Sequence, residues 1–147
     1  VQAPQNPNPQ GGNNLPGSGG FEGMAINASG TKLYPMLERP LSTDPDQSRL
    51  IVSEFDIATE SYTGVTFGYR LEPLGRAIGD MVAVDDTRFL VIERDARQGD
   101  PTIPEFTNPA QFKKIFMVDM SVLDSEGFAK KTEVADLMNI ADPLDLN

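Results

Sequence analysis

The sequence predicts an all-β fold, a β-propeller of antiparallel four-stranded blades, of which this chain of 147 residues would supply about two. Short apolar segments alternate with turns rich in Gly, Asp, Asn and Ser, as in sheets of short strands. The pattern restarts after about 55 residues, and a four-stranded repeat of this size is typical of a propeller blade. The second predicted strand of each repeat also ends in a common motif, Leu37-Glu38-Arg39 and Ile92-Glu93-Arg94.

The first repeat contains four apolar segments that we expect to form strands. They cover residues 21–26, 32–38, 49–57 and 62–71. The segment 27–31 has the composition of a tight turn, in which Gly30 can adopt a positive φ. The segments 40–47 and 58–61 supply the other two connections, so the four strands form one meander.

The second repeat contains four more segments with the same order of strand and turn. Strands are predicted over residues 79–84, 88–94 and 114–120, with a long loop over 95–111 that has two prolines near its middle. The last segment, 130–137, is either a strand or the start of a short helix that runs to Ile140.

These elements predict three parts of the chain. Residues 1–20 consist mainly of Pro, Asn, Gln and Gly, so we expect a loop or disordered arm. Residues 21–75 form the first blade, and residues 76–147 form the second blade and the start of the next connection. Two blades cannot close a propeller, and their open strand edges would aggregate. The chain is therefore expected to be a fragment, or to be completed by blades of the same or another chain.

The composition excludes several classes of function. The formal net charge is −10 and the pI is about 4.3, which disfavours nucleic acids as partners. The chain has no Cys and no His, which excludes Ser–His–Asp triads and His- or Cys-ligated zinc. No apolar stretch approaches the roughly 18 residues that a membrane span needs. No Gly-x-Ser-x-Gly motif is present, which argues against a conventional serine esterase.

Four carboxylates stand at the ends of predicted strands, at corresponding places in the two repeats. They are Glu22, Glu38, Asp80 and Glu93. Carboxylates that share a central channel would repel one another, and a calcium ion would relieve that repulsion and hold a phosphate. The sequence therefore predicts a calcium site made by these four residues. The competing and preferred interpretation is structural, with the acids pairing with Arg39, Arg94 or backbone amides and tying the blades together.

The repeated Glu-Arg motif also supplies candidate catalytic residues, which are Glu22, Arg39, Glu93 and Arg94. The guanidinium groups of Arg39 and Arg94 could hold a phosphate or carboxylate through paired hydrogen bonds. A salt bridge between blades is the competing and preferred interpretation of the same motif.

Several motifs together resemble a known family. They are Gly20-Phe21-Glu22-Gly23-Met24-Ala25-Ile26, Gly30-Thr31-Lys32-Leu33-Tyr34, Leu37-Glu38-Arg39-Pro40-Leu41, Ile78-Gly79-Asp80-Met81-Val82-Ala83-Val84, Arg88-Phe89-Leu90-Val91-Ile92-Glu93-Arg94-Asp95 and Lys114-Ile115-Phe116-Met117-Val118-Asp119. Over roughly residues 20–125, the chain resembles the phytase-like domain described as "esterase-like activity of phytase". The resemblance implies a β-propeller in an exported bacterial protein, periplasmic or extracellular.

The resemblance also implies the hydrolysis of phosphate or carboxylic esters, possibly with calcium, and a small-molecule ester or phosphate as the substrate. Two alternatives remain open. The chain could be a non-catalytic propeller module that binds or serves as a scaffold in the cell envelope, or an accessory subunit of a larger assembly.

Overall fold

The computed structural model describes residues 12–15, 17, 19–99 and 102–141, and this part of the chain is all-β. Its strands are β1 (Phe21–Ile26), β2 (Lys32–Leu37), β3 (Arg49–Asp56), β4 (Ser61–Arg70), β5 (Ala77–Ala83), β6 (Arg88–Arg94), β7 (Lys113–Leu123) and β8 (Ala129–Asp136), followed by the short 3₁₀ helix η1 (Leu137–Asn139). The all-β prediction is confirmed. Within the described residues, no helix is long and apolar enough to cross a membrane.

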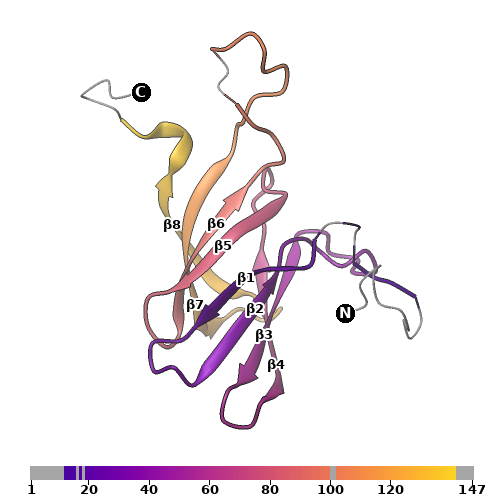
Figure 1. Cartoon of the computed structure of the whole chain (residues 1–147), viewed down its shortest axis with the longest axis vertical. Helices are drawn as coiled ribbons and strands as arrows, with labels where there is room; N and C mark the ends of the chain where they lie inside the picture. The colour runs from indigo at the N-terminus through magenta and orange to yellow at the C-terminus, as the bar shows by residue number, and fades with distance from the viewer. Residues whose placement is uncertain (1–11, 16, 18, 100–101, 142–147) are drawn as a thin grey trace.

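The strands form two antiparallel four-stranded sheets in chain order, β1-β2-β3-β4 and β5-β6-β7-β8 (Figure 1). Two meanders of this kind are what two propeller blades would supply, as the repeat predicts. The described residues form no closed ring of blades. Figure 1 shows the two sheets side by side, with the connection between β6 and β7 extending away from them at the upper end.

The first hairpin of each sheet has the same construction. In the first sheet Gly23 pairs with Met36, and a bulge lies between Phe21 and Gly23. In the second sheet Met81 pairs with Val91, after a bulge between Ile78 and Asp80. A bulge bends a strand and is retained where that bend is needed. The sequence repeat therefore corresponds to a structural repeat.

One hydrophobic core fills the space between the two sheets. Alternate residues of each strand point into it, because side chains alternate between the faces of a sheet. Tyr34 and Met36 of β2 meet Phe89 and Val91 of β6, and the Tyr34 and Phe89 rings lie 4.9 Å apart, edge to face. Residues at corresponding positions of the two repeats thus share one core.

The sheets are joined along both of their sides. On one side β1 lies next to β5, and the amide of Ile78 donates to the carbonyl of Glu38 at 3.2 Å. On the other side β4 meets the start of β8, where Gly68 donates to the carbonyl of Gly127 at 2.9 Å. These contacts fix the ends of β2, β4 and β6 near one another.

Some strand limits differ from the predicted ones. Strand β5 begins at Ala77 rather than residue 79, and β7 continues to Leu123 rather than residue 120. The ambiguous last segment forms β8 and then η1, which begins where the Asp136 side chain accepts from the amide of Met138. The predicted N-terminal arm falls largely on residues 1–11, 16 and 18, outside the described part of the chain.

Candidate functional site

Three arginines line one pocket of about 370 Å³ at the ends of β2 and β6. Arg39 follows β2, Arg94 ends β6, and Arg76 lies in the connection that leads into β5. Gln47 and Gly75 also line this pocket. The chain has a formal net charge of −10, so a pocket lined by three guanidinium groups is a positively charged region on an acidic protein.

The strand ladder holds two of these arginines together. The amide of Arg76 donates to the carbonyl of Arg94 at 2.9 Å, which continues the pairing of β5 with β6. Arg94 already has a carboxylate partner, because its Nη2 lies 2.7 Å from Glu38 Oε1. No ion pair of the Arg76 side chain occurs among the described residues. Arg76 is therefore the guanidinium group of this pocket whose charge a bound anion could neutralise.

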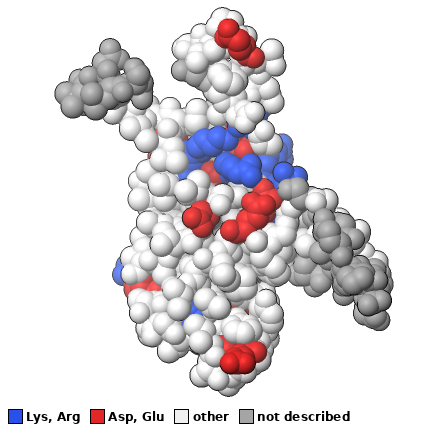
Figure 2. All heavy atoms as spheres, in the orientation of Figure 1, with Lys and Arg blue, Asp and Glu red and all other residues white. Residues whose placement is uncertain are grey.

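Arg76 also borders two further hollows, so three pockets meet at this side chain. A pocket of about 170 Å³ contains Arg97 from the loop after β6. A larger one, of about 820 Å³, contains Arg70 and Lys130 beside the β7–β8 hairpin. Figure 2 shows a patch of basic side chains below the extended loop, with acidic side chains beneath it.

Glu38 lies behind the arginine pocket and is only 2% exposed. Its Oε1 accepts from Arg94 Nη2 at 2.7 Å, and its Oε2 lies 3.8 Å from Arg39 Nε. Among the described residues, Oε2 has no hydrogen-bond partner. The Glu38–Arg94 contact joins the first sheet to the second, as the structural interpretation of the Glu-Arg motif expects.

Glu93 is completely buried, and both of its carboxylate oxygens are occupied. Oε1 accepts from the amide of Glu72 at 2.7 Å. Oε2 accepts from the Tyr69 hydroxyl at 2.6 Å and from Lys131 Nζ at 3.0 Å. Burial and the charge of Glu93 raise the pKa of Tyr69, which therefore remains a donor at neutral pH. Through its bond to the amide of Glu72, Glu93 thus holds the connection 71–76 in place.

Asp95 occupies a similar position beside Arg97. It is 5% exposed, and its oxygens accept from Lys113 Nζ and from the amides of Gln111 and Phe112. Burial acts to raise the pKa of Asp95, but these hydrogen bonds and the Lys113 charge bring it below its ordinary value. The Asp95 carboxylate is therefore ionised, and both of its oxygens are bonded to protein groups.

The remaining predicted site residues, Glu22 and Asp80, are exposed on β1 and β5. Asp80 Oδ1 accepts from the neighbouring amide of Met81 at 2.7 Å. In the described part of the chain, no three acidic side chains are grouped so that they could hold a metal ion. Glu38 and Glu93 already bind cationic partners, and the described residues do not group the four carboxylates together. The calcium site therefore stays a prediction, without support from this geometry.

The structure therefore brings Arg39 and Arg94 into one pocket, places Glu38 and Glu93 behind it, and leaves Glu22 and Asp80 outside it. The sequence did not single out Arg76 or Arg97. The only available signal was the position of Arg76 three residues before the predicted strand 79–84; the observed strand β5 begins directly after it, at Ala77, and pairs with Arg94.

Comparison with known proteins gives one match. The family model "Phytase-like: Esterase-like activity of phytase" matches residues 1–146. No curated protein and no solved structure matches the chain. Because the family match covers almost every residue, and the motifs at Leu37-Glu38-Arg39 and Ile92-Glu93-Arg94 lie within it, the chain belongs to the phytase-like family.

Proposed function

We propose that this chain hydrolyses anionic esters, above all phosphate esters. In this proposal Arg39, Arg76 and Arg94 bind the phosphoryl group of the substrate. The observation that carries the proposal is the pocket of about 370 Å³ that these three arginines line. Guanidinium groups match phosphate oxygens in geometry and charge, and each such contact is a strong, charge-assisted hydrogen bond. Membership of the phytase-like family supports the same class of reaction.

The chemistry requires little from the protein beyond position and charge. Phosphoryl transfer passes through a loose transition state, and the negative charge is spread over the phosphoryl oxygens. Fixed cationic donors around those oxygens stabilise that charge and hold the phosphorus in line with an attacking water. Arg76 is the residue best placed for this role, because it borders all three pockets and has no competing ion pair within the described chain.

A second function, binding without turnover, is favoured by one specific observation. The carboxylates nearest to the arginines, Glu38, Glu93 and Asp95, are each buried and bonded to a cationic or amide donor. The one oxygen of the three that has no hydrogen-bond partner in the described chain, Glu38 Oε2, is buried 3.8 Å from Arg39 Nε and is not accessible to an attacking water. A binding module would hold a phosphorylated ligand in this pocket and release it unchanged.

The experiment compares Arg76→Gln with the unaltered chain. Phosphate release from p-nitrophenyl phosphate and from phytate would be measured, with p-nitrophenyl butyrate as the carboxylic ester. We expect kcat/KM for the phosphate esters to fall about 30-fold, which corresponds to the loss of about 2 kcal/mol of charge-assisted bonding. Hydrolysis of the uncharged butyrate ester should change much less.

Arg88→Gln is the matched control, because Arg88 is an exposed strand arginine that pairs with Asp85 and lines none of these three pockets. Equal losses in both variants would contradict the assignment. Calorimetric titration with phytate separates the two functions: tight binding that Arg76→Gln weakens, without phosphate release, identifies a binding module. Absence of both binding and release would reject the proposal.

A further inference from the structure

A fourth pocket lies at the opposite end of the strands from the arginines. It has a volume of about 340 Å³, within the range of about 300–1,000 Å³ that is common for small-molecule sites. The turn between β1 and β2 and the end of β3 form one wall, and the turn between β5 and β6 and the end of β7 form the other. This pocket plays no part in the function proposed above.

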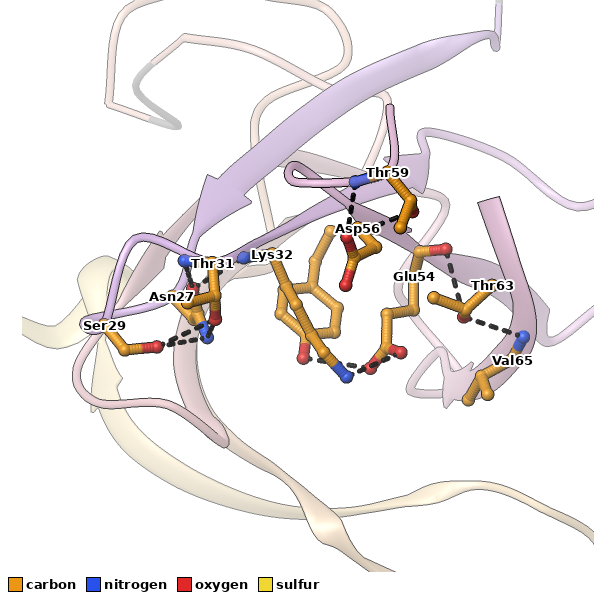
Figure 3. Close-up of polar contacts among 10 residues, drawn as sticks. Asn27, Ser29, Thr31, Lys32, Glu54, Asp56, Thr59, Thr63 and Val65 are labelled. Atoms are coloured by element: carbon orange, nitrogen blue, oxygen red, sulfur yellow. Dashed lines mark hydrogen bonds and ion pairs between the residues drawn. The ribbon is translucent and has the colours of Figure 1, made fainter. Parts of the chain in front are cut away.

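The centre of the pocket is a buried carboxylate with two partners. Glu54 is 7% exposed; its Oε1 lies 2.7 Å from Lys32 Nζ, and its Oε2 accepts from the Tyr34 hydroxyl at 3.2 Å. Figure 3 shows Lys32 reaching the carboxylate of Glu54. Burial acts to raise the pKa of Glu54, but the hydrogen bond from Lys32 and its charge lower it below the ordinary value. Burial, followed by the charge of Glu54, raises the pKa of Tyr34 to about 12.

The rim of the pocket is a fixed network of hydroxyl and amide groups. The Asn27 side chain donates to Ser29 Oγ at 2.9 Å and to Thr31 Oγ1 at 3.1 Å, as Figure 3 shows. Across the pocket, Asp86 Oδ1 accepts from the amide of Ser29 at 2.7 Å and so connects the turns of the two sheets. The network is therefore organised before any ligand arrives.

These groups select the chemistry of a ligand. Lys32 Nζ keeps N–H donors beyond its bond to Glu54, and the Glu54 carboxylate keeps further acceptor sites. The Tyr34 hydroxyl gives its proton to Glu54 and can accept a hydrogen bond. An anion would meet the carboxylates of Glu54 and Asp86, and a cation would meet Lys32. An apolar molecule would remove water from these polar groups without replacing its hydrogen bonds. A hydroxyl group donates and accepts at once, and the apolar side chains of Phe67 and Met120 can contact C–H groups of the same molecule.

We propose that this pocket binds a neutral polyhydroxylated molecule of about the size of a hexose, with Lys32, Tyr34 and Glu54 as its principal hydrogen-bonding residues. The site is separate from the arginine pocket and differs from it in charge, so the chain has one binding site for an anion and another for a polyol.

The test is a titration of the ¹⁵N-labelled chain with D-glucose, followed by NMR. We expect shifts confined to the amides of residues 27–34, 54 and 86–87, with a Kd of the order of 1 mM. Tyr34→Phe keeps the ring in the core and removes the hydroxyl that accepts from the ligand, and Lys32→Met removes the ammonium donor. Each variant should weaken glucose binding about five-fold, as for the loss of one hydrogen bond.

Lys114→Met is the matched control, because Lys114 is a strand lysine that pairs with Glu133 outside this pocket, and this variant should bind glucose normally. Glucose 6-phosphate tests the charge preference and should bind here more weakly than glucose. The proposal is overturned if glucose causes no shift in this region at about 100 mM, a concentration that saturates a millimolar site. It is also overturned if both variants bind like the unaltered chain.

Discussion

At the scale of single residues, two tyrosine hydroxyls donate to buried carboxylates, and these contacts raise the pKa of both tyrosines. Tyr34 donates to Glu54 at 3.2 Å, and Tyr69 donates to Glu93 at 2.6 Å. In both cases burial and the adjacent negative charge disfavour the phenolate, and the pKa of each tyrosine is raised. The hydroxyl protons are thus part of what holds each carboxylate in place.

We predict that the stability of the chain falls as the pH rises above about 10. Between the ordinary pKa of 10.0 and the value of about 12 in the folded chain, unfolded Tyr34 loses its proton while folded Tyr34 keeps it. The unfolded state then binds fewer protons, so the free energy of unfolding decreases with pH, by about 1 kcal/mol for this residue after allowance for solvent screening. Urea unfolding at several pH values measures the slope, and Tyr34→Phe should make it shallower, while the part due to Tyr69 remains. An unchanged slope in that variant would contradict the account.

At the scale of elements, the connection 71–76 between the two sheets is held by Glu93. The amide of Glu72 donates to Glu93 Oε1, and a Cβ atom added at Gly75 would lie 1.9 Å from that same oxygen. No side chain can be accommodated there unless the buried carboxylate moves. Because this connection carries Arg76, the packing of Gly75 on Glu93 sets the position of the guanidinium group.

We predict that Gly75→Ala destabilises the chain by about 2–4 kcal/mol, because it combines overpacking with a displaced buried carboxylate. Gly79→Ala is the matched control, since an added Cβ at Gly79 would meet its nearest neighbour, Ile92 Cγ2, at an ordinary 3.7 Å. That variant should stay within about 1 kcal/mol of the unaltered chain. Chemical denaturation measures both, and similar costs for the two alanines would show that Glu93 does not constrain the connection.

The strands were predictable from the sequence, but some of their ends were not. In β6 the buried residues Phe89 and Val91 alternate with more exposed ones, and turn residues precede the strand, which is a local signal. The start of β5 at Ala77 depends on the bond between Arg76 and Arg94, which forms only when β6 is in place. Two of the three pocket arginines, Arg39 and Arg94, were candidates from the sequence. The third, Arg76, joins them through pairing between distant segments, which the sequence does not show.

At the scale of the whole molecule, the arrangement of the two sheets decides what is buried. The corresponding faces of the two repeats meet, with Tyr34 against Phe89. The opposite face of the second sheet keeps apolar residues in solvent, among them Val82 at 57% and Ile92 at 37% exposure. Because both faces carry apolar residues, the pattern in the sequence did not indicate which faces would pack together.

The Glu38–Arg94 pair joins the two sheets, and we predict that replacing Arg94 destabilises the chain more than replacing Glu38. Arg94→Met leaves a carboxylate that is 2% exposed, with one oxygen already without a hydrogen-bond partner in the described chain. That variant should lose about 3 kcal/mol, as when one partner of a buried pair is removed. Glu38→Gln should lose only about 1–2 kcal/mol, because the Arg94 side chain is 32% exposed and can be hydrated.

A double-mutant cycle measures the contribution of the pair itself. Urea unfolding of both single variants and of the double variant should give a coupling of about 2 kcal/mol. The Lys114–Glu133 pair lies within the second sheet and is more exposed, so the same cycle there should give less than about 1 kcal/mol. Equal costs for Arg94→Met and Glu38→Gln, with no coupling, would mean that the apolar core alone holds the sheets together. The arginine pocket would then be formed by a pair that contributes nothing to stability.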